Sequence, residues 1–193
     1  MENKNMNDES TCVLCGKALS RYGNKKIKDG VLCRNCIKAA SSWLNDDDYE
    51  RLGLEEYKEH LAYREKNKEL LKTFKADKKV EGKYSLYLDE EKEEFLISKR
   101  KDYVKDNADV ISYADIDEIS IFEEKYMDTE DVDICFDMKL NNPQIDNIYF
   151  RVNEFPGLVK GSEEHTAALD LAFDYLDAFE QQESIDFEQK EGE

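Results

Sequence analysis

Two pairs of cysteines constrain the fold of this chain more than any other feature. Cys12 and Cys15 form one CxxC pair, Cys33 and Cys36 form a second, and seventeen residues separate the pairs. Two thiolates three residues apart can reach one ion when the backbone turns tightly, and Gly16 directly after Cys15 permits that turn. The spacing is typical of a four-cysteine zinc site. We therefore predict one structural Zn²⁺ ion bound by Cys12, Cys15, Cys33 and Cys36.

Four cysteines in two pairs allow three other uses. A redox dithiol needs only one CxxC pair, and an iron–sulfur cluster can also take four cysteines, so both stay open as alternatives. The glycine after the first pair and the short intervening hairpin favour zinc. Catalytic zinc needs an open coordination position, which four thiolates do not leave. The loop is too short to bury a core, so metal binding should supply roughly 10 kcal/mol or more of folding free energy.

Length and apolar patterning limit the number of domains and the class of protein. With 193 residues and 22.6 kDa, the chain has room for one ordinary domain plus a small one, or for two modest domains. The first ten residues lack the apolar run of a secretory signal, and the longest apolar run is Cys12–Cys15. No stretch approaches the length of a membrane span. Cysteines in metal-type pairs also suit a reducing compartment, so we predict a cytoplasmic protein.

Charge is distributed unevenly along the chain. Residues 1–45 carry a net charge of +4, residues 46–79 carry −1 and residues 80–193 carry −21, for a total of −18. A segment as acidic as the last one repels phosphate groups, which disfavours binding of nucleic acid or anionic lipid there. A basic protein partner is its natural complement.

Composition and periodicity divide the chain into five parts. We predict a disordered leader at 1–10, a zinc-binding finger at 11–45, a helical connector at 46–79, a β module with a C-terminal helix at 80–182 and an acidic tail at 183–193.

Helix signals occur in three places. Asn45 to Asp48 offer capping groups for a new helical turn, and a mixed apolar and charged pattern predicts a helix from Leu54 to about Ala76. The middle of this helix, Arg64–Glu69, has few apolar residues, so we expect it to bridge the two parts of the chain through solvent. The last helix should begin at a Ser162 cap. Its predicted apolar stripe consists of Leu169, Ala172, Phe173, Leu176 and Phe179.

Beyond Val80 the apolar period changes to two, which predicts strands. Tyr84–Leu88 and Phe95–Ile97 should form a hairpin around a turn at Asp89–Lys92. Further strands are expected at Val110–Tyr113, Ile119–Phe122, Val132–Leu140 and Ile145–Val152. Antiparallel strands closed by one C-terminal helix make the fold class α+β.

No residue set points to catalysis. Cys135 alternates with the apolar residues of its strand and lies beside carboxylates, which disfavour a thiolate, so a structural role is expected. His60 and His165 have no partners at ligand spacing, which favours surface or capping roles. The acidic run Asp46–Asp48 is typical of a solvated helix start. We predict that the protein is not an enzyme.

A family resemblance adds to this interpretation. The phrases CVLCGKAL and KIKDGVLCRNCIKAA are similar to the small zinc-ribbon domain DUF4428 of uncharacterised proteins from Gram-positive bacteria and their mobile elements, including phages. In such proteins a helical connector leads to a module that resembles a pleckstrin-homology (PH) or GRAM-like fold. FKADKKVEGKYSLYLDEEKEEFLI, ISYADIDEISIFEE and KLNNPQIDNIYF are similar to that module. The resemblance, over residues 12 to 180, implies the same four zinc ligands and no catalytic activity. A lipid-binding PH domain presents basic loops, whereas this module is acidic, which disfavours inositide binding.

Two functional hypotheses follow. The first is a non-enzymatic, zinc-containing adaptor whose acidic PH-like module binds a protein partner. The alternative is a nucleic-acid-binding or DNA-mimic regulator, since the cysteine spacing is similar to that of GATA-type DNA-binding fingers. The basic residues that favour it are Lys17, Arg21, Lys25, Lys26, Lys28 and Arg34. The stretch after Cys36, IKAASSWLNDDDYE, lacks the basic helix and tail of such fingers.

Overall fold

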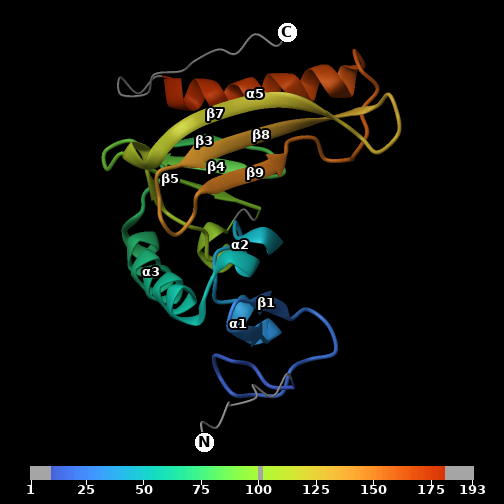
Figure 1. Cartoon of the computed structure of the whole chain (residues 1–193). Helices are drawn as coiled ribbons and strands as arrows, with labels where there is room; N and C mark the ends of the chain where they lie inside the picture. Colours follow the sequence, from blue (N-terminus) through green and yellow to red (C-terminus); the bar gives the residue numbers. More distant parts are fainter. Residues whose placement is uncertain (1–9, 100–101, 181–193) are drawn as a thin grey trace, which may run out of the picture. The chain divides into compact units, whose positions relative to one another are not determined.

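The computed structural model describes residues 10–99 and 102–180 (Figure 1). These residues divide into two compact units, one that ends at Glu69 and one that begins at Leu70. We call them unit 1 and unit 2. The predicted leader and the acidic tail lie outside the described residues, apart from Ser10. The fold class is α+β, as predicted.

Unit 1 contains one short hairpin, two short helices and most of a long third helix. Gly30 lies in the hairpin with φ +148°, and a side chain there would meet Val13 at 3.2 Å, so glycine lets these segments approach. The elements are β1 (Lys25–Ile27), β2 (Gly30–Leu32), α1 (Arg34–Ile37), α2 (Asp46–Arg51) and α3 (Leu54–Thr73), whose last residues belong to unit 2.

The start of α2 follows the predicted capping. Asn45 accepts a hydrogen bond from the N–H of Asp48 at 3.1 Å, and the carboxylate of Asp48 accepts one from the N–H of Asn45 at 2.8 Å. This reciprocal pair satisfies two backbone donors that the first turn would otherwise leave open. The boundary of α2 is therefore encoded locally.

The apolar core of unit 1 extends beyond the predicted finger. Tyr57, in α3, has no exposed surface and packs in the same cluster as Cys12, Ile27 and Leu32. Its hydroxyl donates a hydrogen bond to the carbonyl of Cys36 at 3.0 Å. Residues 11–45 thus share their core with α2 and with the start of α3.

The expectation that the middle of α3 crosses solvent is wrong. Arg64 and Asn67 are each only 1% exposed. Together with His60 and Leu71 they form one buried stripe at spacings of three and four residues. Because most of this stripe is polar, a search for apolar periodicity could not detect it.

Unit 2 is built on two antiparallel sheets. The first has the order β3-β4-β5-β6 and the second has the order β7-β8-β9. The elements are β3 (Lys78–Val80), β4 (Ser85–Asp89), β5 (Glu94–Ser98), α4 (Tyr103–Asp106), β6 (Ile111–Ser112), the 3₁₀ turn η1 (Tyr113–Asp115), β7 (Ile116–Lys125), β8 (Val132–Leu140), β9 (Asn147–Arg151) and α5 (Glu163–Glu180). The predicted strands are present. Strand β3 and helix α4 were not predicted, because Lys-Lys-Val and a single helical turn have no strong apolar pattern.

The terminal helix α5 contacts both sheets of unit 2. The ring of Phe179 lies 5.1 Å from that of Phe95 in β5, and the ring of Tyr175 lies 5.7 Å from that of Phe136 in β8. Figure 1 shows α5 running along the second sheet. The hydroxyl of Tyr175 also donates to the carbonyl of Tyr84. Helix α5 therefore completes the core of the unit.

The start of α5 matches the prediction, but the predicted stripe needs correction. Ser162 Oγ accepts a hydrogen bond from the N–H of His165 at 3.1 Å, so Ser162 is the cap. Phe173, however, is 50% exposed. The buried face consists of His165, Ala168, Ala172, Tyr175, Ala178 and Phe179. The prediction was incomplete because it considered only apolar residues, whereas His165 and Tyr175 also lie on the buried face.

Candidate metal centre

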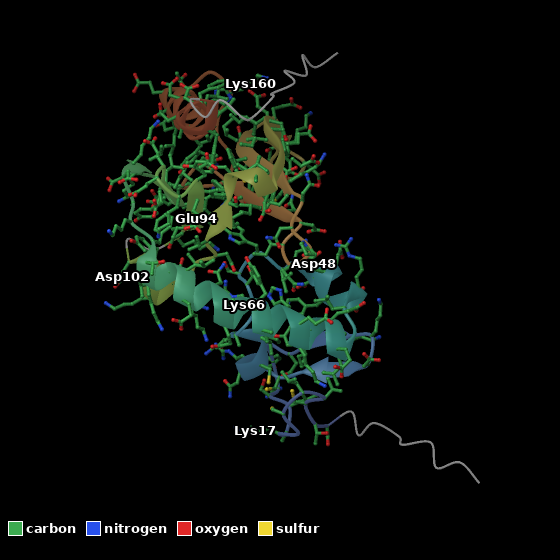
Figure 2. All side chains as sticks on the ribbon, turned by 90° about the vertical axis from the view of Figure 1, so that its left-hand side faces the viewer. Lys17, Asp48, Lys66, Glu94, Asp102 and Lys160 are labelled. Atoms are coloured by element: carbon green, nitrogen blue, oxygen red, sulfur yellow. The ribbon has the colours of Figure 1, made fainter. Side chains whose placement is uncertain are left out.

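The structure brings the four predicted ligands together. The sulfur atoms of Cys12, Cys15, Cys33 and Cys36 all lie within 4.8 Å of one another, and all four are free thiols. Figure 2 shows the sulfur atoms of unit 1 gathered in the part of the chain that carries Lys17. Among the described residues, no other group of histidine, cysteine and carboxylate side chains converges in this way.

Two backbone turns position the sulfurs. The N–H of Gly16 donates to the carbonyl of Cys12 at 2.8 Å, which closes the first turn, and Gly16 has φ +68°. The N–H of Val13 donates to the carbonyl of Val31 at 3.0 Å, which ties this turn to β2. Cys33 follows β2 directly, and α1 carries Cys36. The sequence between the pairs therefore forms a hairpin that brings its two ends together.

The local electrostatics favour some thiolates and oppose others. Burial raises the pKa of the Cys12 thiol, but backbone N–H groups, with that of Cys33 first, outweigh it and lower this pKa to about 6. The N–H of Cys36 similarly lowers the pKa of Cys33. Burial, followed by the neighbouring sulfurs, raises the pKa of Cys36. All four groups could be thiolates at once only with a cation among them, which this cluster could hold.

The sulfur spacing fits zinc. A tetrahedral site with Zn–S bonds of about 2.3 Å places its sulfurs about 3.8 Å apart. The Cys12 and Cys36 sulfurs are separated by 3.8 Å, as are those of Cys15 and Cys33. Such a site is closed, with no position for a substrate.

The basic residues near the cluster are partly neutralised. Lys25 forms an ion pair with Asp46, and Lys28 lies 4.0 Å from a carboxylate oxygen of Glu56. Asp46 belongs to the acidic run at which α2 starts, and the other end of that run, Asp48, serves as a cap and pairs with Arg51. The run is a helix start, as predicted, but Asp48 is buried rather than solvated.

Cys135 is buried in β8 with no exposed surface. Its sulfur lies 3.2 Å from the hydroxyl of Tyr149 and 3.8 Å from a carboxylate oxygen of Glu124. Burial first, and nearby carboxylates next, raise the pKa of this thiol. The arrangement fits the structural role that was predicted.

Both histidines were expected in surface or capping roles, and the surface part of that prediction is wrong. His60 is 1% exposed, and its Nε2 accepts a hydrogen bond from the N–H of Ser41 at 3.0 Å. His165 is 5% exposed, and its Nε2 lies 3.0 Å from a carboxylate oxygen of Glu123. Both partners are distant in sequence, so local spacing could not reveal them. The hydrogen bond from Tyr57 to the carbonyl of Cys36, 21 residues away, could not be inferred from local spacing either.

Comparison with known proteins bears on unit 1. A family model described as a domain of unknown function, DUF4428, matches residues 11–60, which is well under half of the chain. This match and the four-sulfur cluster fit a zinc-ribbon type of domain. The matched range includes Tyr57, in keeping with a core that extends past residue 45. No curated protein and no solved structure matches the chain.

Proposed function

We propose that this protein is a zinc-stabilised, non-enzymatic interaction protein of the cytoplasm. Unit 1 is a domain held by one Zn²⁺ ion on Cys12, Cys15, Cys33 and Cys36. Unit 2 binds a protein partner. The observation that carries the proposal is the closed four-sulfur cluster, because it can stabilise a fold but leaves no coordination position for a substrate.

A PH-like fold for unit 2 is part of this proposal. Four strands in sequence order form one sheet, three more form the next, and a C-terminal helix then contacts both. That order supports the likeness suggested by the sequence. Modules with an open sheet edge commonly bind an extended peptide there.

Strand β7 is the best candidate for such an edge. It is ten residues long and pairs only with β8 among the described residues. Its sequence, IDEISIFEEK, carries four carboxylates and one lysine. A basic peptide would complement this edge, whereas anionic lipid or nucleic acid would be repelled. Within residues 10–99 and 102–180, no helix is long and apolar enough to cross a bilayer.

Two experiments test the proposal. Elemental analysis of the full chain should return one zinc per molecule. The absence of stoichiometric metal would contradict the proposal that zinc stabilises unit 1. The full chain should also capture a specific basic protein from extract at physiological salt, and the purified pair should bind again. Asp117→Lys in β7 should weaken binding of this partner, because it alters the edge strand. Asp170→Lys in α5, the matched control, should leave binding unchanged.

The alternative of nucleic-acid binding through unit 1 has its own test. The pairing of Lys25 with Asp46 and of Lys28 with Glu56 argues against it, since these lysines already face carboxylates. Salt-dependent binding of the zinc-loaded chain to single- or double-stranded DNA or RNA would favour it. No mobility shift at low salt would remove it.

A further inference from the structure

Three large apolar side chains are exposed at one end of unit 2. Met127 and Phe155 are each 75% exposed, and Val159 is 65% exposed. Met127 lies in the turn between β7 and β8, and the other two lie in the segment between β9 and α5. Figure 1 shows the turn and the segment at the same end of the unit. We call these three residues the tip surface.

The segment that carries Phe155 is fixed by a buried polar network. Asp133 accepts hydrogen bonds from Asn153 Nδ2 at 2.9 Å and from the N–H of Gly157 at 2.8 Å. Asn153 also donates to the carbonyl of Phe155 at 2.6 Å. Asp133 and Asn153 are 8% and 6% exposed. The backbone on both sides of Phe155 is therefore anchored, and the ring is held in water.

The turn that carries Met127 is also ordered, and it packs on the same segment. Thr129 donates from its N–H and from its hydroxyl to the carbonyl of Tyr126, at 3.2 and 2.6 Å. Met127 adopts φ +52°, which is unfavourable for a side chain of its size. A Cβ on Gly157 would lie 2.8 Å from the ring of Tyr126, so glycine permits the close packing of turn and segment.

Charge around the tip surface selects the kind of partner. Residues 125–131 contain three carboxylates and one lysine, and so do residues 153–164. The lysines are already engaged, since Lys125 lies 3.7 Å from Glu130 and Lys160 lies 2.6 Å from Glu123. An apolar patch with an acidic rim repels anionic lipid and a second copy of this acidic chain. It complements a segment that combines apolar side chains with lysine or arginine.

We infer that the tip surface is the anchoring site for a basic protein segment whose apolar side chains cover Met127, Phe155 and Val159. This inference rests on the proposed function; it adds a second contact surface to the β7 edge and adds apolar side chains to the chemistry of the basic partner. Anchored loops lose little conformational freedom on binding, which suits exposed side chains to this role.

Selection from a random peptide library on the zinc-loaded full chain tests the inference. Enriched peptides should combine lysine or arginine with large apolar residues. Their affinity, measured by fluorescence anisotropy at physiological salt, should fall at least about tenfold in the double variant Met127→Ser/Phe155→Ser. Phe173→Ser, which alters an exposed aromatic residue on α5, should bind as the parent chain does. Both variants should keep the far-UV circular dichroism of the parent, because the altered side chains are exposed.

Each other outcome has a defined meaning. Enriched peptides that bind the double variant and the parent chain equally overturn the inference and leave the proposed function standing. If the library yields no binder and no partner is captured, the proposed function fails as well. Binding to phosphatidylglycerol vesicles that the double variant loses identifies a membrane site instead. A concentration-dependent dimer that the double variant loses identifies a second copy as the occupant. Either of these last two results overturns the inference.

Discussion

Units 1 and 2 of this chain reach a stable core by different means. Among the described residues of unit 1, the core cluster has seven buried apolar residues, and two of them are the cysteines Cys12 and Cys33. The core of unit 2 holds stacked and edge-on aromatic rings from two sheets and α5. A small unit with few apolar side chains needs a metal to fold, whereas a larger one can rely on buried apolar surface. The comparison implies that the two units should respond to different perturbations.

Removal of the metal should have the largest effect. Excess chelator, or Cys33→Ser, should unfold unit 1 through the loss of on the order of 10 kcal/mol of binding free energy. Unit 2 should stay folded. Trp43 is the only tryptophan and lies in unit 1, so its fluorescence reports this unit alone. Far-UV circular dichroism of the remaining strands should be retained, and a parallel collapse of both signals would break the comparison.

Truncation of an aromatic residue in unit 2 should give the converse result. Phe136 is fully buried and contacts the rings of Phe150 and Tyr175. Phe136→Ala should lower the free energy of unfolding of unit 2 by about 3–5 kcal/mol in urea titrations. Zinc content and Trp43 fluorescence should not change. A loss of zinc in this variant would show that the units are not independent.

A smaller effect is expected at Asp133, and it should depend on pH. Burial raises the pKa of Asp133, but hydrogen bonds from Asn153 and Gly157 and the nearby Arg151 outweigh it, so the pKa is lowered on folding. Because the folded pKa is depressed, this carboxylate stabilises unit 2 above its unfolded pKa, and the contribution is lost as pH falls through the folded value. Asp133→Asn should cost about 1–3 kcal/mol at neutral pH. The difference from the parent chain, measured by urea unfolding across acidic pH, should shrink toward zero, and a constant difference would contradict this account.

The smallest predicted effect concerns the helix cap in unit 1. Asn45→Ala removes the side chain that accepts the N–H of Asp48, so it should cost about 1 kcal/mol. The metal-loaded unit should tolerate this change and keep its zinc. The loss of stability can be measured as a lower chelator concentration at the midpoint of the change in Trp43 fluorescence. If zinc were lost outright, α2 would matter more to the site than the sulfur geometry suggests.

The sequence predicted those features that depend on short spacing. The two CxxC pairs predicted the convergence of four sulfurs, Asn45 and Ser162 predicted two helix starts, and alternation predicted the strands of unit 2. The identity of the metal, the partner and the bacterial or phage origin stay predictions.

Features that depend on distant contacts were missed. Ser41 lies 19 residues from His60, and Glu123 lies 42 residues from His165, so neither partner could be found by local pattern. Arg64 and Asn67 were expected in solvent because burial of polar side chains has no periodic apolar signature. The tip surface was missed because exposure of Phe155 follows from the Asp133 and Asn153 network, whose members are 20 residues apart.

The burial of Cys135 has a practical consequence. Its thiol has no exposed surface and a raised pKa, whereas the other four thiols belong to the metal cluster. A chromogenic thiol reagent should therefore react slowly with the loaded protein, then titrate four equivalents when a chelator is added. The fifth equivalent should appear only when denaturant opens the second core. The number of modified sulfurs therefore distinguishes two states of the chain. Four indicate that only the metal site has opened, and five indicate that the core of unit 2 has unfolded as well.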